Sequence, residues 1–416
     1  MKIDNLRSEK IGNRARAVAT VIWEDCDRPP QETYFETTEK YAEGLSCNPH
    51  AFLVGSILPA MHHGEKRIFI DAEICPELRD GLMTSMSWIR HWRYGPESEL
   101  VRIEAKTRSY LPTARAAARA GVFFSGGIDG LAQIRLNRLS YPREHPGSFK
   151  DALIMFGPYW ESNDRPETFE QAMSDLSDFA RDAAIELIPV YTNIRDLDKD
   201  TMRFIYEYHG AILASVAHAF SRRLSAVTIS STDDIPSLAL LKRKDFRILG
   251  SHPLLDPNYS SSDLLIKHGS VTLSRFDKTK LLADWGVAIN SIKVCQPNWP
   301  GPNCGICEKC VRTELALLAL DLLDKTKAFP LDDLTEKQVE AITLGSDAEQ
   351  NWTAHHEYLE LIEPLRAKGR NDLVRAINNV FKRYPLHPEL DWKMKVKRFD
   401  NRYLNGSLLR VKRLFY

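Results

Sequence analysis

The pattern of hydrophobic and polar positions divides the chain into three regions. The first, residues 1–115, has short apolar runs typical of strands at Ala15–Trp23, Ala51–Leu58, Arg67–Ile70 and Leu100–Ile103. After Pro76, apolar side chains recur at the spacing of a helix. Short strands with a single helix predict a small N-terminal α+β domain.

The second region, residues 116–325, alternates between mostly apolar runs and longer amphipathic stretches. The runs predict strands buried on both faces, at Gly121–Phe124, Ala152–Phe156, Glu186–Val190 and Ala226–Ile229. The stretches between them predict helices, at Leu131–Leu139, Thr168–Ile185 and Met202–Leu224. Strands that alternate with helices form a parallel sheet with right-handed crossovers. We therefore expect an α/β, doubly wound parallel sheet that binds ligands beyond the carboxyl ends of its strands.

The third region, residues 326–416, is predicted to be helical with a basic end. Helical spacing occurs at Glu357–Ala367 and Asp372–Phe381. The tail after Pro388 mixes Lys and Arg with Phe and Tyr, a composition that binds RNA, an anionic membrane or an acidic partner. A solvated helix packed on the N-terminal domain is the alternative, and the sequence leaves both open.

The composition limits the class of protein without identifying it. Of the 416 residues, 43% are hydrophobic and 27% charged, and the formal net charge is zero, so no overall field attracts nucleic acid. The chain has neither an apolar run of transmembrane length nor the apolar core of a secretory signal. We therefore expect a cytoplasmic protein whose seven cysteines are thiols or metal ligands.

A glycine-rich segment, Ser125-Gly126-Gly127-Ile128-Asp129-Gly130, follows the first predicted strand of the second region and leads into a predicted helix. The two central glycines allow a sharp turn and a close approach of ligand, and N–H groups at the start of a helix attract anions. Ser125 adds a hydroxyl donor, whereas Asp129 either holds the loop or binds Mg²⁺. The segment predicts a phosphate-binding loop, with a tight turn that binds no ligand as the alternative.

The loop resembles the signature of the PP-loop ATP pyrophosphatases, Ser-Gly-Gly-x-Asp-Ser. The resemblance implies that family's fold and its shared step, in which a substrate oxygen attacks the α-phosphate of ATP and pyrophosphate leaves. It also implies that the loop residues bind ATP: Ser125, Gly126, Gly127, Ile128, Asp129 and Gly130. Gly130 departs from the signature, because the family has Ser or Thr there, and one hydroxyl is lost from the pyrophosphate site.

Four of the cysteines are clustered with the spacing C-x8-C-x2-C-x2-C: Cys295, Cys304, Cys307 and Cys310. Four thiolates suit a tetrahedral Zn²⁺, with an iron–sulfur cluster as the main alternative. A site with four protein ligands is closed to substrate. We therefore expect a zinc-binding loop whose metal stabilises the fold and takes no part in the chemistry.

The phosphate loop followed by this cluster is similar to the arrangement in 7-cyano-7-deazaguanine synthase, over roughly residues 118–320. The resemblance implies an ATP-dependent C–N ligase, using ATP and Mg²⁺, that activates a carboxylate or amide for attack by ammonia or an amine. In that family, 7-carboxy-7-deazaguanine is converted to a nitrile. The additional terminal regions suggest a larger acceptor, such as a protein or peptide. Relatives of the synthase occur in bacterial antiphage operons, where protein conjugation is an expected role.

Further candidates lie at the same edge of the predicted sheet. Arg195 follows the third strand and either binds a carboxylate or phosphate or is a solvated loop residue. The run Ser230–Asp234 follows the fourth strand, and its oxygens either read a polar base, hold Mg²⁺ or cap a helix. Arg195 and Lys278 are expected to act with Asp129 in catalysis. Substrate contacts are expected from Asn193, His209, Ser251, His252 and Asp256.

Two other functions stay open at this point. A tRNA-modifying PP-loop enzyme would use the basic tail to bind RNA, with a steep dependence on salt. A non-catalytic, nucleotide-binding scaffold subunit would account for the missing hydroxyl at Gly130. The sequence does not indicate the oligomeric state.

Overall fold

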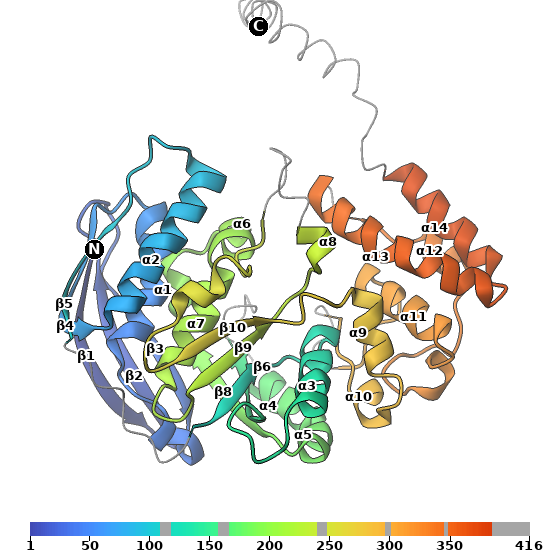
Figure 1. Cartoon of the computed structure of the whole chain (residues 1–416), viewed down its shortest axis with the longest axis horizontal. Helices are drawn as coiled ribbons and strands as arrows, with labels where there is room; N and C mark the ends of the chain where they lie inside the picture. Colours follow the sequence, from blue (N-terminus) through green and yellow to red (C-terminus); the bar gives the residue numbers. More distant parts are fainter. Residues whose placement is uncertain (109–117, 157–165, 239–247, 296–300, 345–347, 385–416) are drawn as a thin grey trace, which may run out of the picture. The chain divides into compact units, whose positions relative to one another are not determined.

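The structure, a computed structural model, describes residues 1–108, 118–156, 166–238, 248–295, 301–344 and 348–384 (Figure 1). The chain divides into two compact units. The first unit consists of Met1–Cys304 with Lys325–Pro330, and the second of Gly305–Asp324 with Leu331–Tyr416. Each unit has its own secondary structure.

The first unit is built on a sheet of ten strands in the order β10-β9-β6-β7-β8-β3-β2-β1-β4-β5. Their bounds are β1 Lys2–Ile11, β2 Arg14–Ile22, β3 Gln31–Thr38, β4 Arg67–Ile74, β5 Arg102–Thr107, β6 Ala120–Phe123, β7 Phe149–Phe156, β8 Glu186–Thr192, β9 Ala226–Ser230 and β10 Leu265–Gly269. The sheet is mostly parallel, so the α/β class predicted from the sequence is confirmed.

Five of these strands form a continuous parallel part of the sheet. From β6 the chain moves outward to β7 and β8, and then returns to the other side of β6 with β9 and β10. This order is compatible with a Rossmann-like fold, in which the reversal opens a crevice at the carboxyl ends of the strands. In this sheet the reversal lies between β6 and β9.

The N-terminal strands continue the same sheet. β3 pairs with β8 in an antiparallel arrangement, through Phe35 with Thr192 and Glu36 with Tyr191. β2 pairs antiparallel with β3 and with β1. β4 pairs parallel with β1, and β5 pairs parallel with β4. The regions 1–115 and 116–325, which the hydrophobic pattern separates, therefore contribute strands to one sheet.

Helices cover both faces of this sheet (Figure 1). Their bounds are α1 Pro49–His62, α2 Pro76–Ile89, α3 Ile128–Ser140, α4 Pro166–Asp175, α5 Ser177–Ala183, α6 Thr201–Arg203, α7 His209–Ala219, α8 Ile235–Leu238, α9 Arg275–Leu281 and α10 Gly286–Asn290. α1 packs against α7 and α2, and their apolar side chains join those of β1 to β4 in one hydrophobic core. α3 packs against β6, β7 and β9 and against α9.

One predicted strand is a helix. Ala51–Leu58 lies within α1, which begins at Pro49 after Asn48, whose side chain accepts a hydrogen bond from the N–H of His50. Every residue of α1 from His50 to Met61 is buried. A helix buried all round shows no polar face, and a continuous apolar run does not distinguish it from a buried strand.

Two predicted helices are interrupted in the structure. Thr168–Ile185 contains α4 and α5, which separate at Leu176. Met202–Leu224 contains most of α6, then a π-helical turn, η4 (Phe204–Tyr208), and then α7. π-Helical turns are rare and frequently accompany functional sites.

The second unit is helical where the structure describes it. Its helices are α11 Glu308–Ala319, α12 Glu336–Glu340, α13 Ala348–Ala367 and α14 Asn371–Arg383. Both segments with helical spacing, Glu357–Ala367 and Asp372–Phe381, lie in helices as predicted. The basic tail lies outside the described residues. No helix in the described ranges is long and apolar enough to cross a membrane.

Candidate functional site

The glycine-rich loop lies at the carboxyl end of β6, beside the reversal of strand order. β6 ends at Phe123, and α3 begins at Ile128, so the loop joins a strand to the N-terminus of a 13-residue helix. β9 pairs with β6 and ends at Ser230, which brings the run Ser230–Asp234 to the same edge. The structure thus places two predicted candidate segments at the crevice where such sheets bind ligands.

Gly126 has a backbone that other residues rarely adopt. Its φ of +79° is left-handed, and a Cβ there would lie 3.1 Å from Cβ of Lys293 and 3.2 Å from a methyl carbon of Leu176. The N–H of Lys293 donates to the carbonyl of Gly126 at 2.8 Å. Lys293 and Leu176 therefore both lie against the loop, and Lys293 also bonds to its backbone. Sequence reasoning missed Lys293, which has no local signal because it lies far from the loop in the chain.

Asp129 is engaged by two cations from α9. Arg275 Nη1 donates to Asp129 Oδ2 at 2.7 Å, and Lys278 Nζ donates to Oδ1 at 3.0 Å. Charge-assisted bonds of this kind are strong because both partners are ionised. Of the two roles predicted for Asp129, holding the loop and binding Mg²⁺, these contacts favour the first.

Lys278 is fully buried, with a side-chain exposure of 0%. Besides Asp129, its ammonium donates to the carbonyls of Ser231 at 2.6 Å and Thr232 at 3.2 Å. An ammonium has three N–H donors, and the three acceptors account for them. Lys278 therefore ties the loop after β9 to the first turn of α3.

Gly130 packs under the ring of Phe124. A Cβ at this position would lie 3.0 Å from Cδ2 of Phe124, and Phe124 in turn stacks on Phe179 at 5.1 Å between ring centroids. A serine would have to displace that ring. The position of Phe124 therefore leaves little room for a side chain at position 130.

Asp233 lies just beyond β9 and is partly buried. Burial is the main cause that raises its pKa, to about 6, with Asp129 and Asp234 acting in the same direction and Lys278 and His268 opposing. Among the residues that the structure describes, no hydrogen bond or ion pair reaches its carboxylate. Its backbone is fixed, because Ser231 Oγ donates to the Asp233 carbonyl at 2.6 Å.

A second polar cluster surrounds Asp256, which has no exposed surface. His268 Nδ1 lies 2.7 Å from Asp256 Oδ2, and Ser251 Oγ donates to the same oxygen at 2.7 Å. A Cβ at Gly210 would lie 2.1 Å from Asp256 Oδ1, so the missing side chain makes room for the carboxylate. Three expected substrate contacts, Ser251, His252 and Asp256, are therefore neighbours.

Two imidazole nitrogens in this cluster are buried without a hydrogen-bond partner among the described residues, Nε2 of His268 and Nε2 of His252. Burial is the main cause that lowers the pKa of His252 to about 4, with His268 acting in the same direction. Burial likewise lowers the pKa of His209 to about 4, against the charge of Asp256. Buried polar atoms that lack a partner need an explanation, and a polar ligand is one.

The two other predicted candidates make contacts nearer to the N-terminal strands. Asn193 Oδ1 accepts from the N–H of Tyr34 at 2.9 Å, and its Nδ2 donates to the carbonyl of Glu32 at 2.8 Å. Asn193 thus joins β3 to the end of β8. Arg195 donates to Thr201 Oγ1 at 2.9 Å and lies over the ring of Phe204.

The four clustered cysteines come together in space. Their Sγ atoms lie within 4.8 Å of one another, although Cys295 and Cys310 are 15 positions apart in the chain. Asn303 supports the segment: its Oδ1 accepts from the N–H groups of Val294 and Cys295. Four converging thiols are the donor set of a tetrahedral zinc site, and the residues therefore fit the predicted metal.

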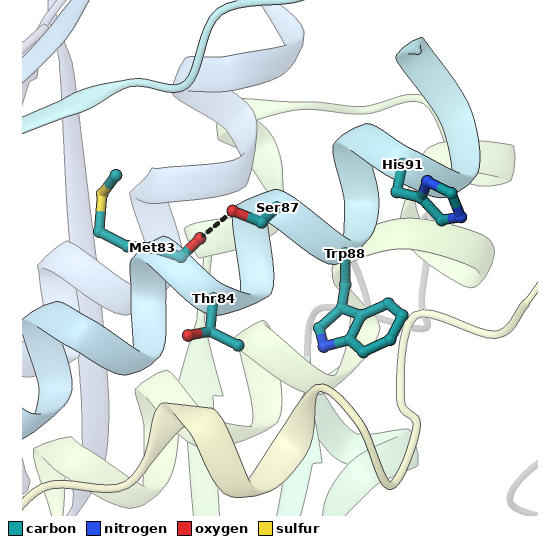
Figure 2. A pocket seen from close by; sticks show the side chains of 5 residues that line it. All are labelled: Met83, Thr84, Ser87, Trp88 and His91. Atoms are coloured by element: carbon teal, nitrogen blue, oxygen red, sulfur yellow. Dashed lines mark hydrogen bonds between the residues drawn. The ribbon is translucent and has the colours of Figure 1, made fainter. Parts of the chain in front are cut away.

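A hollow of about 500 Å³ lies elsewhere, on the surface of α2 (Figure 2). It is lined by Met83, Thr84, Ser87, Trp88 and His91. Ser87 Oγ donates to the Met83 carbonyl at 2.8 Å, as is common for serine inside a helix. Four of these residues lie on α2, and His91 lies in the π-helical turn η2 (Arg90–Tyr94) that follows it. None was predicted to bind ligand. We therefore place the candidate site at the sheet edge.

Comparison with protein-family models, with curated proteins and with solved structures gave no match.

Proposed function

We propose that the chain is an ATP-dependent enzyme that cleaves ATP between its α- and β-phosphates and activates a carboxylate or amide for attack by ammonia or an amine. The observation that carries the proposal is the loop Ser125–Gly127, which joins β6 to α3 beside the reversal of strand order. A glycine-rich turn into a helix N-terminus is suited to bind phosphate, and this crevice is where such sheets bind nucleotides.

In the proposed complex the loop holds the β- and γ-phosphates. The N–H groups of Gly126 to Gly130 and the hydroxyl of Ser125 supply donors, and the dipole of α3 adds partial positive charge. The left-handed backbone of Gly126 keeps the turn open to an anion. Asp129, Arg275 and Lys278 fix the first turn of α3, so they act on the phosphates by positioning the loop.

The reaction then has two steps. An oxygen of the substrate attacks the α-phosphorus, the bond to the bridging oxygen breaks, and pyrophosphate leaves. Ammonia or a primary amine next attacks the activated carbon, the carbon–oxygen bond breaks, and AMP leaves. Positioning of the reactants and stabilisation of charge supply most of the catalysis in phosphoryl transfers of this kind.

The Asp256 cluster is the proposed substrate side of the site. Asp256 holds His268 through Nδ1, which leaves Nε2 as a hydrogen-bonding group for a polar substrate. His252 presents a second unpartnered Nε2. A ring with adjacent donors and acceptors, such as a deazapurine, suits these groups, and a protein or peptide is the proposed acceptor for the activated product.

We propose Zn²⁺ as the metal of the cysteine cluster, held by Cys295, Cys304, Cys307 and Cys310. A closed site of four thiolates stabilises the surrounding fold and leaves no position open for substrate. The zinc therefore has a structural role in this proposal.

The proposal is tested by measuring pyrophosphate release from ATP with 7-carboxy-7-deazaguanine and ammonium as the trial substrates. Release that needs both ATP and 7-carboxy-7-deazaguanine supports the proposed reaction. ATP binding without any pyrophosphate release contradicts catalysis and favours the nucleotide-binding scaffold.

A further inference from the structure

Asp129, the acidic residue of the loop, is already neutralised by the protein. Its Oδ1 accepts from Lys278 and its Oδ2 from Arg275, so both oxygens have a cationic partner. A divalent cation at Asp129 would have to displace buried Lys278, whose ammonium would then lose an acceptor in the interior. The charge balance at Asp129 therefore disfavours a metal there.

Asp233 presents the opposite situation at the same crevice. It follows β9, the strand beside the loop, and its charge interacts with those of Lys278 and Asp129. Within the described ranges, its carboxylate has no hydrogen bond and no ion pair. Burial raises the pKa of this carboxylate. A carboxylate without a direct hydrogen-bond or ion-pair partner can take a metal ion as that partner.

The loop that carries Asp233 is tightly positioned. Lys278 donates to the carbonyls of Ser231 and Thr232, and the N–H of Ser231 donates to the carbonyl of Gly269 at 2.9 Å. The same lysine contacts Asp129 in the first turn of α3. Asp233 is thereby fixed next to the helix end where the phosphates are proposed to bind.

We propose that the carboxylate of Asp233 is the protein ligand of the Mg²⁺ that accompanies ATP. This inference rests on the proposed function. Mg²⁺ in nucleotide sites keeps several waters and takes one or two carboxylates together with phosphate oxygens. One carboxylate at the crevice meets that requirement. The neighbouring Asp234 is used differently, since its Oδ1 accepts from the N–H of Ser237 at 2.9 Å at the start of α8.

The inference predicts two effects of opposite sign for Asp233→Asn. The variant loses a metal ligand, so divalent cations no longer strengthen ATP binding. It also loses a negative charge that repels the phosphates, so ATP binds in the absence of metal as tightly as to the unmodified chain, or more tightly. A variant that merely damages the fold would weaken binding under both conditions.

The experiment is calorimetric titration of the zinc-loaded protein with ATP, once with EDTA-free Mn²⁺ buffer and once without divalent cations. In the unmodified chain we expect Mn²⁺ to tighten ATP binding by about tenfold or more, and in Asp233→Asn by about twofold or less. The control is Asp284→Asn, which also removes one carboxylate but at an exposed position. This variant should keep the full effect of Mn²⁺.

Two results overturn the inference while leaving the ATP site intact: a full effect of Mn²⁺ in Asp233→Asn, or an equal loss of affinity with and without metal in that variant. If the unmodified chain binds no ATP under either condition, the proposed function itself fails, and the inference fails with it. The three results are distinguishable in one set of titrations.

Discussion

The ammonium of Lys278 lies 3.0 Å from Asp129 Oδ1 and links two segments that are about 100 residues apart in the chain, the first turn of α3 and the loop after β9. Lys278 itself comes from α9, so three elements meet at one buried charge. Such a contact fixes the distance between the proposed phosphate loop and Asp233. The geometry of the candidate site therefore depends on this lysine.

Replacement of Lys278 should destabilise the protein. Lys278→Met removes one of the two cations at Asp129 and leaves the carbonyls of Ser231 and Thr232 without their donor. We expect a loss of at least about 2 kcal/mol in the free energy of unfolding, measured in urea. Lys280→Met, whose half-exposed lysine pairs with nearby Asp277 and lies over the ring of Phe276, should cost less than about 0.5 kcal/mol. Equal costs would contradict the role given to Lys278.

Introducing the serine of the PP-loop signature at position 130 should not improve the protein. Gly130→Ser places a Cβ 3.0 Å from the ring of Phe124, which the stack with Phe179 keeps in place. We expect a loss of about 1–2 kcal/mol in unfolding free energy and no gain in ATP affinity. Gly286→Ser is the matched control, because a Cβ at Gly286 meets nothing within 4 Å. Tighter ATP binding by Gly130→Ser would show that the missing hydroxyl matters more than packing.

The cysteine cluster should bind one zinc per chain. Elemental analysis of the purified protein is expected to find zinc near unit stoichiometry, and Cys295→Ser to remove most of it along with some thermal stability. Cys47→Ser, outside the cluster, should keep the full metal content. Iron in place of zinc would contradict the assignment of the metal.

Stability should depend on pH through His62, the last residue of α1. Its Nδ1 lies 2.9 Å from Asp198 and its Nε2 lies 2.9 Å from Glu207. Burial alone would lower the pKa of His62, but the two carboxylates outweigh burial and the pKa is raised. A group whose pKa is raised on folding contributes its full stability below the unfolded pKa and loses it as pH rises through the folded pKa.

The cost of His62→Gln in unfolding free energy should therefore be largest near pH 6 and shrink by pH 9. Urea unfolding at several pH values measures it, with His91→Gln, an exposed position in the turn after α2, as the control. Asp198, whose pKa falls to about 2 against the effect of burial, stays ionised over this range. A cost that stays constant or grows with pH would contradict the charged state assigned to His62.

The sequence predicted those parts of the site that are local in the chain. Ser125–Gly127 between a buried strand and a helix was recognisable because turn chemistry and periodicity act within a few residues. The spacing of the four cysteines likewise predicted that they converge. The parallel strands from β6 to β9 followed from their apolar runs.

The contacts that complete the site were not predictable in this way. Lys278 was expected to act with Asp129, but its bonds to the carbonyls of Ser231 and Thr232 were not foreseen. Lys293 reaches the loop from far away in the chain, and nothing in its own surroundings marks it. β1 and β3 were missed because their sequences are mostly polar, and β10 because its apolar run is very short. The sequence of α1 predicts a strand because burial on all sides removes the helical period.

Cleavage of ATP at its α-phosphate is the central step of the proposed reaction, and the nucleotide product tests it most directly. The zinc-loaded protein is incubated with ATP, Mg²⁺, 7-carboxy-7-deazaguanine and ammonium, and the nucleotides are separated and quantified. We expect AMP and pyrophosphate in equal amounts, with both lost in Gly126→Val, in which the left-handed position of the loop is blocked. ADP with inorganic phosphate, or AMP formation unchanged in Gly126→Val, would contradict it.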